Sequence, residues 1–242
     1  MRIAHFSDLH LGYSHLNKKA EDGRNQRLVD FERASIAFAE AAVAENADLA
    51  VVAGDLFHKI NMFPAALSGA VSFVNILEQA GIPLLVIVGN HDEVEAIATY
   101  NGLKFLEVHT VINLFLDQGY YDTEEARFHL VSYRLLSRAA SERGELRPFE
   151  FEEGKANILV THGYVVDRSV EHDIMEEAET VIPDSWLDDP RFDLFLLGHI
   201  HKHYSPREKA FYAGSAERRN FGEAKTEPAF YIHELNGTDV DT

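Results

Sequence analysis

The sequence predicts an α/β fold in which strands and helices alternate and pack in layers. Five short apolar runs end abruptly in Gly, Asp, Asn or His residues, which is typical of buried strands with polar groups at their carboxyl ends. Segments with apolar residues at helical spacing separate the first three runs, and this alternation places helices over the faces of a sheet. In such folds ligands collect at the carboxyl ends of the strands.

The N-terminal part is predicted as three strands joined by two helices. The strands are RIAHFSD (2–8), DLAVVAGD (48–55) and IPLLVIVGNHD (82–92). The apolar helical positions are Leu28, Phe31, Ser35, Phe38 and Ala42 in the first helix, and Leu67, Val71, Val74 and Leu77 in the second.

The rest of the chain is predicted to add further strands that end in polar residues and then short strands broken by turns. Two more runs that end in polar residues lie at ANILVTHG (156–163) and FDLFLLGHIH (192–201), and FHLVSYR (128–134) is a further predicted strand, with a loop or short helix at 137–149. After His201, short β-like pieces broken by turns indicate antiparallel strands, and therefore a sandwich rather than a simple open sheet. We expect the last residues, NGTDVDT, to fray.

Length and composition favour one globular domain that spans residues 1–242, since 46% of the residues are hydrophobic. The start, MRIAHFSDLH, has no basic leader, and no apolar run approaches the roughly 18 residues of a membrane span, so we expect a cytoplasmic protein without a membrane partner. The absence of cysteine excludes disulfides and thiolate ligands. Any bound metal must therefore be held by nitrogen and oxygen atoms.

The chain is strongly acidic. Forty acidic residues against 22 basic ones give a formal charge of −18, which argues against general electrostatic adhesion to nucleic acid or to an anionic membrane. Solubility, or life at high salt, explains most of this excess, because only a few of the acids could be metal ligands.

Polar side chains at the ends of the five predicted strands form the candidate site. Residues two apart at a strand end project to the same side, which applies to the D-x-H and H-x-H pairs. Each motif alone has an ordinary explanation, such as a helix cap, a Gly-Asn turn or a structural histidine. Together they are too many for one tetrahedral ion and suit two ions about 4 Å apart. The predicted metal ligands are Asp8, His10, Asp55, Asn90, His162, His199 and His201.

The motif order D-x-H, G-D, G-N-H-D, H and G-H-x-H resembles the calcineurin-like metallophosphoesterases. Within that superfamily, the stretches SDLHLGY, AGDLFH and YAGSAERRNFGE are similar to the SbcD-type nucleases of DNA double-strand-break repair. The resemblance implies a layered α/β/β/α fold, a β-sandwich flanked by helices. It also implies a two-metal-dependent phosphodiesterase that cuts DNA as an exonuclease or endonuclease through a hydroxide shared by the ions.

The resemblance also divides the ligands between two ions, most simply Mn²⁺, with Fe or Zn as alternatives. Asp55 would bridge the ions; Asp8, His10 and His201 would complete one site, and Asn90, His162 and His199 the other.

Two further histidines are predicted to face the substrate. His91 follows a ligand without being one, so it could protonate the leaving oxygen; the alternative is a structural histidine bonded to Asp92. His58 follows Asp55 by three positions and resembles a second substrate-facing histidine of the nuclease branch; the alternative is an ordinary residue at a helix start. His203 has no matched motif position, and we expect it not to be a ligand.

Two aromatic residues each have a functional and a structural explanation. Tyr13 and Phe221 lie in the nuclease-like stretches, where they could shape a substrate groove or pack in the core.

The chain departs from the nuclease branch beyond the YAGS stretch. The capping domain and the region that binds an SbcC-like ATPase are expected to be absent, so the chain is either part of a longer protein or a minimal enzyme. The expected partners are DNA, an SbcC-like ATPase and a second copy in a homodimer.

Other functions remain open on the same metal core. A small-molecule phosphodiesterase or phosphatase is one alternative, although GDLFHKI lacks the arginine of the protein phosphatases. A metal-bound scaffold for an ATPase partner is the alternative that is not an enzyme.

Overall fold

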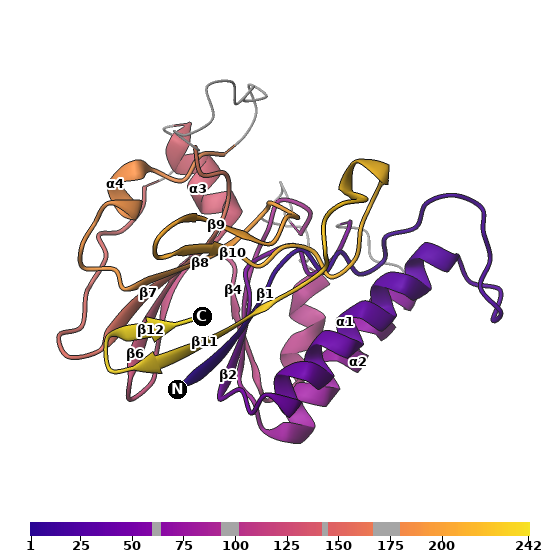
Figure 1. Cartoon of the computed structure of the whole chain (residues 1–242), viewed down its shortest axis with the longest axis horizontal. Helices are drawn as coiled ribbons and strands as arrows, with labels where there is room; N and C mark the ends of the chain where they lie inside the picture. Colours follow the sequence, from indigo (N-terminus) through magenta and orange to yellow (C-terminus); the bar gives the residue numbers. More distant parts are fainter. Residues whose placement is uncertain (60–63, 93–101, 142–144, 167–179) are drawn as a thin grey trace.

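The structure is a computed structural model that describes residues 1–59, 64–92, 102–141, 145–166 and 180–242. The strands of these residues form two six-stranded sheets (Figure 1). The first sheet has the order β12 (Asp239–Asp241), β11 (Tyr231–Asn236), β1 (Arg2–Phe6), β2 (Leu49–Val52), β3 (Leu84–Ile87) and β4 (Ile112–Phe115). The second has the order β5 (Gln118–Asp122), β6 (Ala126–Val131), β7 (Ala156–His162), β8 (Leu194–Gly198), β10 (Ala210–Tyr212) and β9 (Tyr204–Arg207).

The two sheets pack face to face and carry helices on their outer faces, which confirms the predicted α/β/β/α layering (Figure 1). Between the sheets, Val51 and Ile87 pack against Leu130 and Val160. The outer face of the first sheet is covered by α1 (Gln26–Ala44) and α2 (Pro64–Ala80). The second sheet packs its outer face against α3 (Tyr133–Ala140) and α4 (Asp184–Leu187), and the 3₁₀ turns η1 (Gly102–Val108) and η2 (Phe221–Glu223) complete the described elements.

Helix α1 shows how the sequence produces these layers. The side chain of Asn25 caps the helix by accepting a hydrogen bond of 2.9 Å from the backbone N–H of Arg27. The predicted helical positions Leu28, Phe31 and Ser35 are buried, and the Ser35 hydroxyl donates to the carbonyl of Phe31. Each large apolar side chain buried in this way stabilises the fold by roughly 1.5–3 kcal/mol.

Two strand predictions are corrected by the structure. The last residues do not fray, because Asp239–Asp241 forms β12, which pairs antiparallel with β11 through register partners such as Leu235 and Val240. The C-terminal strands are not all antiparallel, since β10 runs parallel to β8. The sequence signal for β12 is weak because charged and apolar residues alternate over only three positions.

The pairing of β1 with β11 buries two histidines whose rings meet. The exposed fraction of both His5 and His233 is 0%, and their rings lie 5.6 Å apart. Burial lowers the pKa of His233 from 6.5 to about 3 and holds the pKa of His5 well below its usual range. The unfolded chain then binds protons at a higher pH than the folded one. The free energy of unfolding is therefore at its full value above pH 6.5 and decreases as the pH falls toward about 3.

We expect His233→Phe to make the protein less sensitive to acid. The slope of the unfolding free energy against pH should decrease by up to about 1.4 kcal/mol per pH unit, the value for one proton. Urea unfolding of metal-free protein between about pH 7 and pH 4 measures this slope. The control is Thr242→Val, which removes the hydroxyl that bonds His233 Nδ1 and leaves the imidazole. An unchanged slope in His233→Phe would show that His233 is not held neutral.

Candidate metal centre

The loops that follow β1 and β2 run side by side and carry the first three predicted ligands. The N–H of Asp8 donates to the carbonyl of Gly54 at 3.1 Å, and the N–H of His10 donates to the carbonyl of Asp55 at 3.0 Å. These parallel strands are in register up to Phe6 and Val52, so their carboxyl ends lie at the same edge of the sheet. The pairing of these two loops therefore brings Asp8, His10 and Asp55 together.

The second sheet brings its ligands to the same place. His162 ends β7 and pairs with Gly198 at the end of β8, one residue before His199. The Nδ1 of His162 lies 2.8 Å from the carbonyl of Ala53 in the first sheet. The carboxyl edges of the two sheets thus meet at the site.

The backbone at the site is strained. Of the six non-glycine residues with positive φ in the described part of the chain, four are predicted ligands: Asp8, His10, Asp55 and His199. Such conformations cost of order 1–3 kcal/mol each and persist only where the surrounding structure enforces them. The concentration of strain at these four residues is independent support for a functional site.

Two glycines make room for the cluster. Gly54 has φ +88°, and a Cβ there would collide with the ring of His162. A Cβ at Gly89 would collide with the carboxylate of Asp55. Any larger residue at either position would push a predicted ligand out of place.

One half of the centre consists of Asp8, His10 and His201. The Nε2 atoms of the two histidines lie 3.0 Å apart, and Asp8 Oδ1 lies 3.6 Å from that of His201. Asp8 Oδ1 is buried and has no hydrogen-bond partner among the described residues. A buried carboxylate oxygen without a partner is costly in a protein but is suited to a cation.

The other half consists of Asn90, His162 and His199. Asn90 Oδ1 lies 2.9 Å from His162 Nε2 and 3.2 Å from His199 Nδ1. Since His162 donates its Nδ1–H to the Ala53 carbonyl, its neutral ring turns the lone pair of Nε2 toward the Asn90 oxygen. Burial lowers the pKa of His162 to about 4, which keeps this ring neutral at neutral pH. Two lone pairs that face one another suit a shared cation.

Asp55 lies between the two halves. Its Oδ2 is 3.8 Å from His10 Nε2 on one side and 3.6 Å from His162 Nε2 on the other. Burial, together with the nearby carboxylates of Asp92 and Asp8, raises the pKa of Asp55 well above its usual range. A buried carboxylate in this position gains most from neighbouring positive charge. All seven predicted ligands therefore converge, and they fit two divalent cations that share Asp55.

His58 and His91 lie against this cluster. Their rings stack 5.0 Å apart, and the Nδ1–H of His91 donates to the carbonyl of His58 at 2.9 Å. The backbone N–H of His91 donates to Asp55 Oδ1, so the proposed bridging carboxylate also fixes this residue. Burial lowers the pKa of His58 to about 4 and also lowers the pKa of His91. With His10, the two histidines form a third group whose ligand atoms lie within 4.8 Å of one another.

Two carboxylates support the site that the sequence analysis did not identify. Glu223 Oε1 accepts a hydrogen bond of 2.9 Å from Nδ1 of His201, which fixes the ring tautomer and turns Nε2 inward. Asp92 accepts from the backbone N–H groups of Leu56, Phe57 and Gly89 and so ties the loops after β2 and β3 together. Glu223 lies far from any strand end, so only the three-dimensional contact reveals it.

The remaining residues singled out in the sequence have clear positions. His203 Nδ1 bonds to the Ala213 carbonyl and its ring stacks on Tyr231, and it belongs to none of the groups of candidate metal ligands among the described residues. Tyr13 packs on Phe31 and also reaches His58, with ring centroids 4.9 and 4.8 Å apart, so it serves both the core and the site wall. Phe221 is not a core residue, because 93% of it is exposed.

A layered α/β sandwich with His, Asp and Asn side chains converging at one edge is the architecture of a metal-dependent phosphoesterase domain. The chain matches the calcineurin-like phosphoesterase family over residues 1–203 and belongs to that family.

Two relatives of the chain are a DNA repair protein and a nuclease subunit by name. The chain is 30% identical to the DNA double-strand break repair protein Mre11 of Archaeoglobus fulgidus over 93% of its own length and 52% of the relative. It is 26% identical to the SbcD component of the SbcCD nuclease of Staphylococcus saprophyticus over 99% of its length and 67% of that protein. The chain thus spans about half the length of the archaeal relative.

The fold also matches a solved structure. A dimetal phosphatase from Danio rerio superposes with a TM-score of 0.52 over 97% of this chain and 92% of that one, at 11% identity. This similarity supports the fold alone. Within the described residues, no helix combines the length and the apolar character needed to cross a membrane.

Proposed function

We propose that this chain is the catalytic part of a two-metal-dependent phosphodiesterase that acts as a DNA nuclease. The observation that carries the proposal is the position of Asp55 Oδ2, within 3.8 Å of ligand nitrogens from both halves of the centre. The names of the relatives, a double-strand break repair protein and a nuclease component, support DNA as the substrate.

The metal ions would supply an activated water and neutralise charge on the phosphate, and manganese suits the nitrogen and oxygen ligands. The chain's own residues would hold and orient the reacting groups. Asp55 would be shared between the ions, Asp8, His10 and His201 would hold one, and Asn90, His162 and His199 the other. His201 is in turn oriented by Glu223.

His91 has the geometry of a substrate-facing proton donor. Its Nδ1–H is used by the carbonyl of His58, so Nε2 is the ring atom that can reach a leaving oxygen. Its lowered pKa leaves the free imidazole neutral, and an anionic phosphate beside it would favour protonation. His58 holds His91 through this carbonyl and through ring stacking, which makes it a positioning residue.

We extend the proposal to partners by analogy with the relatives. The name of the SbcCD nuclease implies a complex with a further component, and we propose an SbcC-like ATPase as a partner of this chain. A homodimer and a cytoplasmic location belong to the same proposal.

A small-molecule phosphodiesterase or phosphatase is the second candidate. The formal charge of −18 favours it, because duplex DNA would be repelled from most of the surface. A scaffold without catalysis would have no use for the buried, strained ligand set.

One assay separates these functions. Purified protein with manganese is offered single-stranded DNA, duplex DNA, a small activated phosphodiester and a phosphomonoester. The proposal expects hydrolysis of DNA and of the small diester, both abolished by chelation. Hydrolysis of small esters without DNA cleavage would support the second candidate, and metal binding without hydrolysis would support a scaffold.

We expect His58→Ser to separate DNA processing from metal-centred hydrolysis. The variant should retain both metals and still hydrolyse a small activated diester, whose phosphate needs little orientation, while DNA cleavage decreases by roughly 10-fold or more. Metal content and both rates are measured on one preparation. Equal losses on the two substrates would make His58 part of general catalysis, and no loss on either would return it to a structural role.

A further inference from the structure

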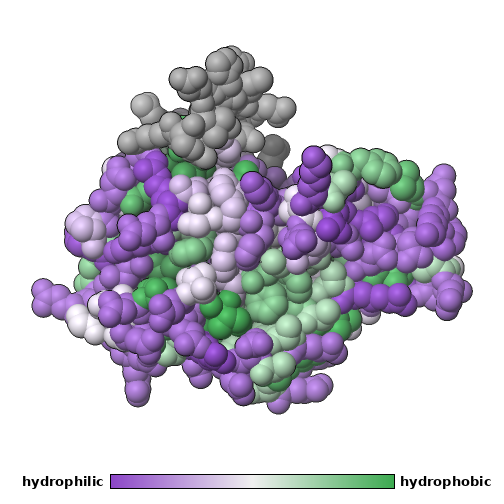
Figure 2. All heavy atoms as spheres, viewed as in Figure 1, coloured by the Kyte–Doolittle hydropathy of each residue, from purple (hydrophilic) through white to green (hydrophobic). Residues whose placement is uncertain are grey.

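Phe221 forms the tip of η2 and points into solvent. Its exposed fraction of 93% is the highest among the exposed large hydrophobic residues of the described chain. Such a side chain contributes little to folding, because it buries almost no apolar surface. Figure 1 shows η2 beside the loop that follows β1, and Figure 2 shows apolar surface next to hydrophilic surface in this upper region of the molecule.

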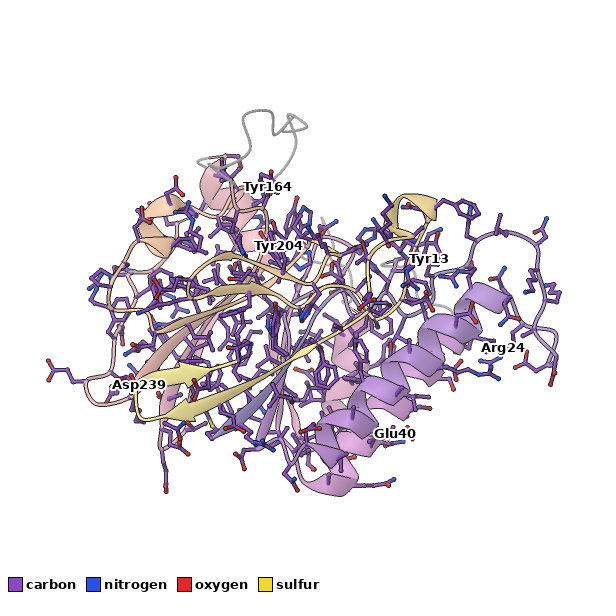
Figure 3. All side chains as sticks on the ribbon, viewed as in Figure 1. Tyr13, Arg24, Glu40, Tyr164, Tyr204 and Asp239 are labelled. Atoms are coloured by element: carbon purple, nitrogen blue, oxygen red, sulfur yellow. The ribbon has the colours of Figure 1, made fainter. Side chains whose placement is uncertain are left out.

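The loop that carries Phe221 is held in place by hydrogen bonds. Asn220 accepts from the N–H of Gly222 at 2.7 Å, and the hydroxyl of Tyr13 donates to the carbonyl of Arg219 at 2.7 Å (Figure 3 labels Tyr13). Glu223 accepts from the N–H of Arg219 with its second oxygen. The aromatic ring is therefore presented by an ordered turn.

A groove of about 340 Å³ opens beside the ring. Its lining includes Leu16, Phe221 and three arginines, Arg27, Arg218 and Arg219, against the single carboxylate of Glu217. In a chain with a formal charge of −18, this concentration of cations is unusual.

The arginines are oriented by their partners. Arg27 pairs with Asp30 at 2.7 Å and with Glu217 at 3.6 Å, and Arg218 donates its Nε–H to the carbonyl of Thr226. A guanidinium has five N–H donors, so each can still bind a phosphate oxygen. Because acidic partners offset part of the charge, the attraction of this groove for a polyanion is modest and must be assisted by another contact.

Two side chains connect the loop that forms this groove to the metal centre. Tyr13, which bonds the loop, has its ring 4.8 Å from that of His58. Glu223, at the end of η2, bonds to the predicted ligand His201. A nucleotide in the groove would therefore lie close to the metal ligands.

We propose that this groove binds an unpaired nucleotide of a DNA strand, with the base stacked on Phe221 and the phosphate on the arginines. The proposal rests on the proposed nuclease function and names the form of DNA that enters the site. An exposed aromatic face beside arginines is the arrangement that binds single strands without sequence preference, since every base has a face that can stack. A paired base would already be stacked within the duplex.

Substrate kinetics test the stack. Phe221→Ala should raise the KM for a single-stranded oligonucleotide roughly fivefold to hundredfold, with kcat largely retained. The ratio of kcat/KM for the oligonucleotide to that for a small activated phosphodiester should decrease by the same factor. Phe221→Tyr should restore the KM, whereas Phe221→Leu, which is apolar but has no aromatic face, should not. Phe105→Ala, at an exposed phenylalanine of η1, is the matched control.

A direct binding measurement keeps this inference separate from the proposed function. The chain has a single tryptophan, so Phe221→Trp in a Trp186→Phe background provides one fluorescent reporter. In metal-free protein, single-stranded oligothymidine should quench it to saturation, and a blunt duplex should quench it less. Phe105→Trp in the same background should not respond.

Several outcomes would overturn the inference. They are an unquenched reporter, an unchanged KM in Phe221→Ala, or the same KM for the oligonucleotide in Phe221→Leu as in Phe221→Tyr. The last result would indicate apolar docking of a protein. A change in oligomeric state between wild type and Phe221→Ala, measured by sedimentation, would instead assign this surface to contact with a second copy of the chain. Saturable quenching without any DNA cleavage would instead contradict the nuclease function and leave the groove as a nucleotide site.

Discussion

Asp55→Asn is expected to remove activity by on the order of 10³-fold and to reduce the metal content of the protein. The substitution keeps the size of the side chain and an oxygen that can accept the hydrogen bond from the N–H of His91, so the local fold should survive. It removes the negative charge that lies between His10 and His162. The loss would follow from the shared carboxylate, because both ions would depend on it.

The same substitution should affect stability in opposite directions with and without metal. The raised pKa of Asp55 means that its negative charge is unfavourable in the metal-free fold at neutral pH. Metal-free Asp55→Asn should therefore unfold at the same temperature as wild type or higher, while added manganese should raise its Tm less. Asp239→Asn, at an exposed position of β12, is the control. Normal cleavage by Asp55→Asn would contradict the two-metal mechanism.

His91→Ala should slow hydrolysis by roughly 10²-fold or more while both metals remain bound. The reason is that His91 holds Asp55 through its backbone N–H, which alanine keeps, and would act on the substrate through its ring. The measurements are kcat with a DNA substrate and metal content by elemental analysis. His109→Ala, which removes an imidazole paired with Glu78 outside the site, is the control.

The opposite result for His91 has a specific structural meaning. His10, His58 and His91 could together hold an ion without any carboxylate, as three imidazoles do in some zinc sites. If His91→Ala lost metal in proportion to activity, this third group would be a metal site and His91 a ligand.

One physical constraint explains why the sequence could predict that these side chains lie together. Strands β1, β2, β3, β7 and β8 are parallel to a neighbour in their own sheets, so polar residues at their carboxyl ends must lie at one edge. The register of the strands then brings His162 beside Gly198 and Asp8 beside Gly54.

Features that depend on contacts between distant segments could not be predicted in this way. Glu223 bonds to His201 from a 3₁₀ turn after β10, and no periodicity identifies such a contact. For Phe221, an aromatic residue in a motif is compatible with burial and with exposure, and only the structure distinguishes the two. The pairing of β12 with β11 likewise depends on the edge that β11 offers, since three alternating residues carry little signal of their own.

Anomalous diffraction from crystals grown with manganese tests the two-metal centre most directly. We expect two peaks, one among Asp8, His10 and His201 and the other among Asn90, His162 and His199, with the carboxylate of Asp55 in contact with both. A single peak, a peak held by His203, or a peak among His10, His58 and His91 without Asp55 would contradict the shared-carboxylate centre.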